Sequence, residues 1–163
     1  MNHLCINTRR YLLYLLILLL PYQAQAGGDS EIAIIVAPDN SWNGLQKPIN
    51  RRQLARIFRK QIIFDREGRR LHPINLSASH PLRKVFSRSL FKRTPQQMAS
   101  FWNEKYFQGI SPPHTIDSQE AMIRFVSSTP GAIGYVAACA TDKRVKILLT
   151  LKIKGKPAPS LCQ

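Results

Sequence analysis

Acidic residues are scarce in this 163-residue chain, which carries 9 Asp and Glu against 24 Lys and Arg, for a formal net charge of +15. Cysteine is scarce as well. With three Cys in all, neither a disulfide-dense miniprotein nor a multi-cysteine zinc site is available. Apolar residues make up 44% of the chain, which excludes a disordered tail and permits a folded core. The length suits one domain and excludes a large two-domain enzyme.

Motifs of the common enzyme classes are missing. The sequence has no G-x-S-x-G elbow, no phosphate loop with Gly-Lys-Ser and no H-E-x-x-H pair. His72, His80 and His114 have no acidic residue spaced to complete a metal site, so we expect ordinary loop histidines. We therefore predict a protein without enzymatic activity, cofactor or bound metal.

Residues 1–26 have the three parts of an export signal. Arg9 and Arg10 give a basic start, ten consecutive apolar residues follow at 11–20, and Ala24-Gln25-Ala26 supplies the small-x-small pattern of a cleavage site. A membrane-spanning helix needs about 18 apolar residues or more. We predict cleavage after Ala26 and a periplasmic mature protein. An uncleaved anchor and twin-arginine export remain open alternatives.

The basic charge is concentrated in one stretch. Residues 51–93 hold 13 Lys and Arg and only two acids, Asp65 and Glu67. In an exported protein this excess favours anionic partners such as a membrane surface, a polymer or an acidic protein, and it makes nucleic acid an improbable partner. A solvated basic surface is the plainer interpretation and remains open.

Cys139 and Cys162 are the two thiols left after cleavage at Ala26. An oxidising envelope would let them pair. We predict a disulfide between them, with two free thiols as the alternative.

Strand and helix signals alternate along the rest of the chain. Short apolar or alternating runs predict strands at residues 32–37, 71–76, 132–137 and 145–153. Capping signals predict helices that begin near Asn50, Ser79, Thr94 and Asp117. This alternation favours a three-layer α/β domain over 32–153, in which helices flank a mixed, mostly parallel sheet and the last strand forms an antiparallel edge. Residues 27–31 would be a linker and residues 154–163 a basic tail.

Two helices carry detailed expectations about which side chains are buried. In the helix capped by Ser79, the spacing buries Leu82, Val85, Phe86 and Leu90 and turns Arg83, Lys84 and Arg88 outward. In the helix that begins near Thr94, the spacing assigns Met98, Phe101, Trp102 and Tyr106 to the core.

The segment between the second strand and its following helix is the candidate functional site. In open α/β sheets, anions bind at helix N-termini beyond the carboxyl ends of strands. Asn75, Ser77, Ser79 and His80 lie at such a junction, within the basic stretch, and offer hydroxyl and amide groups. We predict that they bind an oxyanion. A purely structural role of Ser79 as a helix cap is the alternative.

Three segments resemble the phosphate-binding receptors of ABC transporters. Residues 52–62 are similar to their "L-x-x-I-F-x-G-K-I" pattern, with Arg59 in place of the glycine. Residues 73–79 resemble the next strand and its anion loop, and 129–136, Thr-Pro-Gly-Ala-Ile-Gly-Tyr-Val, match a stretch of the same receptors. The resemblance covers about residues 32–151. It implies one lobe of a type II periplasmic binding protein.

This resemblance implies binding of phosphate or a related oxyanion and a link to an ABC-type permease. In the receptors the anion loop reads approximately "R-S-D-G-S-G-T", of which only Ser79 carries over as a ligand here. The arginine has no counterpart, and Ser77 replaces the acid. One lobe also leaves half of a cleft open, so strong capture would need a homodimer or an envelope protein as the second wall. The alternative function is a single-lobe interaction module that has lost solute binding and uses its basic face on an anionic partner.

Overall fold

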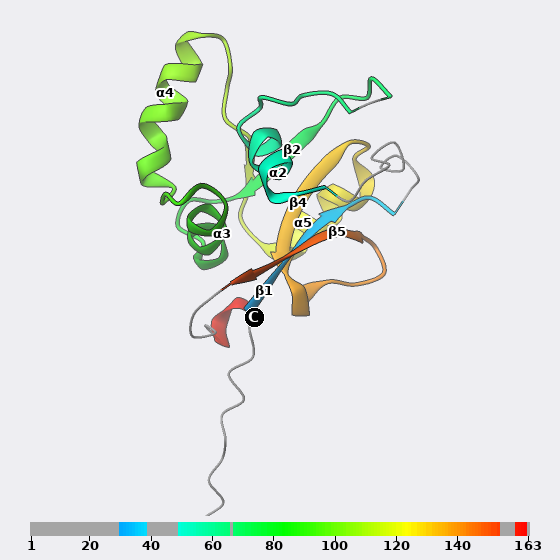
Figure 1. Ribbon diagram of the computed structural model, residues 1–163. Coiled ribbons are helices and arrows are strands. Elements are labelled where there is room, and N and C mark those ends of the chain that lie inside the picture. The colour runs from blue at the N-terminus through cyan, green and yellow to red at the C-terminus, as the bar shows by residue number, and fades with distance from the viewer. Residues whose placement is uncertain (1–29, 39–48, 66, 154–158, 163) are drawn as a thin grey trace, which may run out of the picture.

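A five-stranded sheet organises the part of the chain that the computed structural model describes (Figure 1). The described residues are 30–38, 49–65, 67–153 and 159–162. The expected export signal at residues 1–26 lies outside them. Within the described ranges, no helix is long and apolar enough to span a bilayer.

The strands run mostly in one direction. They are β1 (Ser30–Val36), β2 (His72–Leu76), β3 (His114–Ile116), β4 (Ala132–Ala137) and β5 (Lys146–Ile153), in the order β3-β2-β4-β1-β5 across the sheet. β2 is parallel to both of its neighbours, whereas β1 is antiparallel to β4 and to β5. Four strands therefore share one direction and β1 alone opposes them. The mixed, mostly parallel sheet is confirmed, and β5 is the antiparallel edge.

β1 is buried because it lies between β4 and β5. Its uncharged residues 32–36 have no solvent exposure. Ile34 pairs with Tyr135 of β4 on one side and with Leu149 of β5 on the other. The register with β5 slips after Ile34, where β5 contributes one extra residue, a β-bulge of the kind that bends edge strands.

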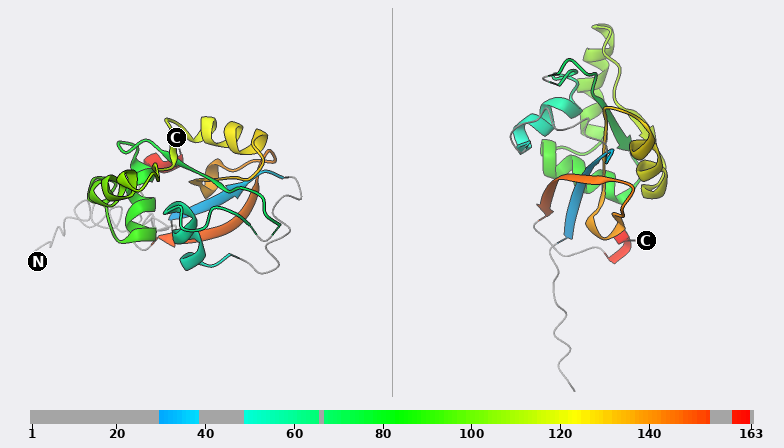
Figure 2. Two further views of the ribbon diagram at one scale, coloured as in Figure 1. Left: turned by 90° about the horizontal axis from the view of Figure 1, so that it is seen from above. Right: turned by 90° about the vertical axis from the view of Figure 1, so that its right-hand side faces the viewer.

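Helices cover both faces of the sheet, which gives the expected three layers (Figure 2). They are α2 (Arg51–Phe58), α3 (Pro81–Phe91), α4 (Ala99–Phe107) and α5 (Gln119–Ser128). On one face, the ring of Tyr135 stacks on Phe86 of α3 with centroids 3.7 Å apart and packs against Phe58 of α2 at 5.9 Å.

α5 packs against the opposite face, where glycine permits its close approach. A Cβ on Gly134 of β4 would lie 2.5 Å from the sulfur of Met122 and 3.0 Å from Val126. Because both of those residues belong to α5, a larger side chain at position 134 would push this helix away from the sheet.

The start signals of α2 and α5 were predicted correctly, but the alignment of Arg59 with the glycine of the receptor pattern was wrong. Asn50 and Gln53 form the expected capping box on α2, and Ser118 caps α5 through the N–H of Ala121. At the end of α2, however, Arg59 has an ordinary φ of −89°, whereas Lys60 has a φ of 54°. The position that favours glycine is thus Lys60, not Arg59.

Two further expectations need correction. The strand β3 was not expected, because three residues that follow a proline pair give almost no periodic signal. Tyr106 is 65% exposed although the spacing assigned it to the core, whereas Phe101 and Trp102 are half-buried. The reason is visible in Figure 1: α4 projects from the domain, and its far end has no sheet to cover it.

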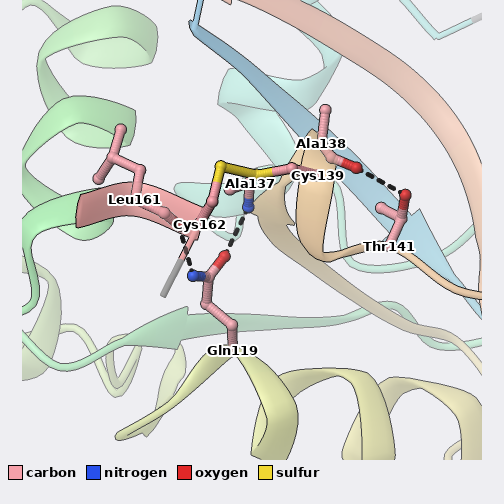
Figure 3. The surroundings of a disulfide bond; sticks show 7 residues. All are labelled: Gln119, Ala137, Ala138, Cys139, Thr141, Leu161 and Cys162. Carbon is pink, nitrogen blue, oxygen red and sulfur yellow. Dashed lines mark hydrogen bonds between the residues drawn. A yellow bond between two sulfur atoms is a disulfide. The ribbon is translucent and has the colours of Figure 1, made fainter. Parts of the chain in front are cut away.

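The end of the chain is tied to the start of α5. The expected disulfide joins Cys162, in the 3₁₀-helix η4 (Pro159–Cys162), to Cys139 in η3 (Ala138–Ala140), with Cα atoms 5.9 Å apart (Figure 3). Beside it, the Gln119 amide accepts the N–H of Ala137 at 2.6 Å and donates to the carbonyl of Leu161 at 2.7 Å. Leu161 is buried, so the packed part of the chain continues past the boundary that we expected at residue 153.

Candidate anion-binding site

The turn between β2 and α3 contains the residues that the sequence predicts as anion ligands. Asn75 lies on β2 and is 4% exposed, and Ser77 and Ser79 follow in the turn with their hydroxyl oxygens 3.3 Å apart. His80 directly precedes the first turn of α3. The structure therefore gathers Ser77, Ser79 and His80 at one helix N-terminus, whereas Asn75 is buried within the sheet.

Backbone donors are available in the same turn. The N–H of Ser77 donates to the carbonyl of Ile116 at 2.9 Å, which ties the turn to β3, and the N–H of His80 donates to the carbonyl of Ser77 at 3.1 Å. Among the described residues, no acceptor pairs with the N–H of Ala78 or of Ser79, and both residues are exposed. Unpaired N–H groups at a helix N-terminus attract anions.

The N-cap of α3 is His80, not Ser79 as the sequence suggested. The Nδ1 atom of His80 accepts the N–H of Leu82 at 3.1 Å, which only an unprotonated Nδ1 can do. Burial lowers the pKa of His80 and so favours this neutral form. The hydroxyl of Ser79 is consequently not used by the helix.

Arg83 is buried, which corrects its expected place on the outer face of α3. It is 8% exposed, and its Nε and Nη1 atoms have no hydrogen-bond partner in the described structure. Burial lowers the pKa of Arg83, and interaction with the hydroxyl of Tyr135 partly offsets this effect. An arginine keeps its charge in proteins, so unsatisfied buried donors of this kind are costly unless an anion meets them.

Tyr135 links the end of β2 to this buried arginine. Its hydroxyl accepts the N–H of Leu76 at 3.1 Å, at the carboxyl end of β2. Burial raises the pKa of Tyr135 to about 12, so the hydroxyl is neutral at physiological pH. The same hydroxyl interacts electrostatically with Arg83, which comes from the first turn of α3.

Two more buried polar atoms belong to this region. Pro73 pairs with Ile133, and strand alternation then puts Asn75 on the same face of the sheet as Tyr135. The Oδ1 atom of Asn75 and the Oγ atom of Ser87 have no partner within the described residues. Ser87 follows Arg83 by one helical turn of α3. Donors and an acceptor thus occur together in an otherwise apolar layer.

Sequence reasoning missed Arg83, Ser87 and Tyr135 as members of this cluster. The arginine that the receptor loop carries within the turn is absent, but α3 supplies one from its first turn. A signal was present, because Arg83 and Ser87 lie four residues apart beside Leu82 and Phe86, on the buried side of the same helix.

Other chemistry-bearing residues lie elsewhere. His72 and His114 both line a small cavity of about 120 Å³ together with Lys60 and Arg70. In the described part of the chain, no three or more His, Cys, Asp or Glu side chains are grouped so as to hold a metal ion. Among the described residues, the β2–α3 turn is thus a better candidate for an anion site than any of these residues is for a metal site.

The fold resembles one lobe of receptors for ABC-type phosphate transport. It matches an ABC-type phosphate transport receptor from Vibrio cholerae with a TM-score of 0.56 and 20% identity, over 73% of this chain and 45% of the receptor. No protein-family model matches the sequence, and a search of curated proteins finds no match either.

Two further solved structures have the same relationship to this chain. One is a putative phosphate ABC transporter substrate-binding protein with bound phosphate from Clostridium perfringens, with a TM-score of 0.55, 15% identity, and 73% of this chain and 44% of that protein covered. The other is PstS from Borrelia burgdorferi, with a TM-score of 0.53, 15% identity, and 79% and 49% covered. The chain therefore matches less than half the length of each of these proteins.

Proposed function

We propose that this chain is an exported, non-enzymatic binding protein that takes hydrogen phosphate or a related oxyanion at the β2–α3 turn. The observation that carries the proposal is Arg83, a buried cation whose Nε and Nη1 lack partners in the described residues and which belongs to the first turn of α3, the helix that follows the unpaired N–H groups of Ala78 and Ser79. An oxyanion is the ligand that satisfies both sets of donors at once. The fold shared with phosphate receptors supports the same ligand class.

The proposal extends to selectivity. Hydrogen phosphate carries one proton and needs an acceptor as well as donors, and the acid that serves this purpose in the receptor loop is replaced by Ser77. The Oδ1 atom of Asn75 is a buried acceptor without a partner in the described residues. We infer that the Oδ1 atom of Asn75 accepts a hydrogen bond from the P–O–H group of hydrogen phosphate, so that phosphate binds better than sulfate, which has no such donor at neutral pH.

An open site needs a second wall for tight capture. Because the chain matches less than half of each receptor, the anion would face water on one side, where screening weakens charge-assisted bonds. A second copy of the chain or an envelope protein, such as an ABC-type permease, is the proposed second wall. Its periplasmic location rests on the signal pattern of residues 1–26.

The test is calorimetric titration of the mature chain with orthophosphate, arsenate and sulfate. Arg83→Met should abolish measurable orthophosphate binding without unfolding the protein, because it removes the unpartnered buried charge and keeps the apolar volume. Arg124→Met is the matched control, since Arg124 is an exposed α5 residue 3.5 Å from Glu120. Unchanged orthophosphate affinity in folded Arg83→Met protein would reject the proposal and favour the interaction module without a solute site.

A further inference from the structure

A basic groove of about 570 Å³ lies apart from the β2–α3 turn. Four cations from three elements line it: Arg51 from the first turn of α2, Arg88 and Lys92 from the end of α3, and Lys152 from the end of β5. All four are exposed. The groove and the β2–α3 turn share no residue, so the groove is a separate feature of the surface.

These four cations have no acidic partners in the described part of the chain. Every ion pair found there involves Arg69, Arg124 or Arg144 instead. The first turns of α2 and α3 also contain no acid. Within the described residues the charge in the groove is therefore uncompensated, and it favours an anionic ligand.

Arg51 is held in place although the helix dipole opposes it. It occupies the first turn of α2, where the positive end of the dipole disfavours a cation. Its Nη2 atom donates to the carbonyl of Ser89 and, at 2.7 Å, to the hydroxyl of the same residue. This contact joins α2 to α3 and fixes one wall of the groove.

Lys92 adds a cation at a position that favours glycine. It is the C-cap of α3 and has a φ of 59°, in the left-handed region where a side chain is strained. Among the described residues, Lys60 is the other non-glycine residue with a positive φ, and it lines the separate 120 Å³ cavity. At both positions the backbone of a lysine is strained. Substitution by glycine would therefore remove one positive charge and relieve the backbone strain at the same time.

We propose that this groove binds a multiply phosphorylated ligand. Its volume lies within the range of small-molecule sites, about 300 to 1,000 Å³, and far exceeds the size of one phosphate. The guanidinium of Arg88 offers a bidentate contact to phosphate, the remaining N–H groups of Arg51 offer single hydrogen bonds, and two ammonium groups offer point charges. Val85 and Ile153 also line the groove and present apolar surface, which suits the carbon skeleton that a phosphorylated compound or a lipid carries. A free polyphosphate compound and a phospholipid headgroup array share this chemistry.

The experiment removes the β2–α3 site first. The parent protein is the Arg83→Met variant, or Ser79→Asp if Arg83→Met does not fold. Inorganic tripolyphosphate is titrated into this parent and into two further variants of it, one with Lys92→Gly and one with Lys60→Gly. We expect tripolyphosphate to bind, Lys92→Gly to weaken binding roughly tenfold, and Lys60→Gly to leave it within about twofold. Both glycine variants should melt no lower than their parent. Adding Arg88→Gln to Lys92→Gly should bring the loss to roughly a hundredfold.

A second arm identifies the source of the phosphate groups. Co-sedimentation with phosphatidylglycerol vesicles, against neutral phosphatidylcholine vesicles, uses the same variants. Vesicle binding that Lys92→Gly weakens and Lys60→Gly does not would assign the groove to lipid headgroups, and tripolyphosphate binding alone would assign it to a soluble ligand. Equal losses in both glycine variants would show that only net charge matters and would overturn the site. So would a protein that binds neither probe.

Discussion

The hydroxyl of Tyr135 accepts the N–H of Leu76 at 3.1 Å, at the carboxyl end of β2. The same hydroxyl interacts electrostatically with the buried guanidinium of Arg83, so one phenol links the last strand residue before the turn to this cation. Tyr135 is therefore a positioning residue for the proposed anion site, since it acts through Arg83 and the turn.

Replacing Tyr135 by Phe should lower both stability and orthophosphate affinity. The ring would still stack on Phe86, but the buried N–H of Leu76 would lose its acceptor, at a cost of about 1 to 3 kcal/mol in unfolding free energy. Arg83 would lose its contact, so orthophosphate affinity should fall by about tenfold. Chemical denaturation and calorimetry measure the two effects. Tyr106→Phe is the control, because Tyr106 is 65% exposed and both quantities should stay unchanged. A variant as tight-binding as the wild type would show that Tyr135 only supports the fold.

Ser79 separates binding from helix capping. Because His80 caps α3, Ser79→Ala should keep the wild-type stability and lose a hydroxyl donor to the anion, about 1.5 to 3 kcal/mol or roughly ten- to a hundredfold in affinity. Ser79→Asp should fold normally, since an acid near a helix N-terminus is favourable by about 0.3 to 1 kcal/mol. It should bind no oxyanion, because its charge occupies the place of the ligand. Calorimetric titration with orthophosphate measures the affinity of each variant. Equal affinity in wild type and Ser79→Asp would refute the site.

His80 should make the stability depend on pH below neutrality. Its folded-state pKa is lowered by burial from the ordinary value of 6.5, so the unfolded chain takes up a proton first as the pH falls. The contribution of the neutral cap is complete above about pH 6.5 and declines as the pH falls through the folded-state pKa. Urea denaturation at about pH 7.5 and about pH 5.5 should reveal the decline. His80→Asn, which keeps a capping oxygen without titrating, should flatten it, whereas exposed His72→Asn should not. An unchanged slope in His80→Asn would contradict the assignment.

The disulfide should stabilise the domain by about 3 kcal/mol, given a sequence separation of 23 residues between Cys139 and Cys162. Denaturation with and without reductant measures this difference. Alkylation of folded protein without reductant should label neither cysteine. Labelling of both would show that the bond does not form in solution.

Export predicts a mature chain that begins at Gly27. Intact-mass analysis of protein from an envelope fraction should show the loss of residues 1–26. A mass that retains them would remove the argument for a periplasmic location.

Local signals predicted most of the fold. The pair Asn50 and Gln53 marked the start of α2, and the apolar run of residues 32–37 marked a buried strand, because both depend on interactions within a few residues. The run of small and apolar residues at 132–137 marked β4 in the same way. β3 was not predicted, because a strand of three residues is defined by its pairing with β2 and not by a pattern in its own sequence.

The candidate site was predicted only in part, for a physical reason. Ser79 and His80 are adjacent polar residues that both can cap a helix, and the tertiary packing decides between them. Arg83 was assigned to the outer face of α3 from the spacing of the apolar residues, whereas the structure buries it beside that stripe, where it interacts with the hydroxyl of Tyr135, a residue distant in sequence. Pairings between distant segments are not readable from a single sequence.

The position of β1 has a consequence for the order of events in folding. This strand is synthesised early, yet both of its partners, β4 and β5, come from the final third of the chain. The centre of the sheet cannot close until those late segments have arrived, and contacts of such long sequence separation form slowly. A precursor would therefore stay unfolded for a comparatively long time, which is the condition in which a polypeptide can be threaded through a narrow translocation channel.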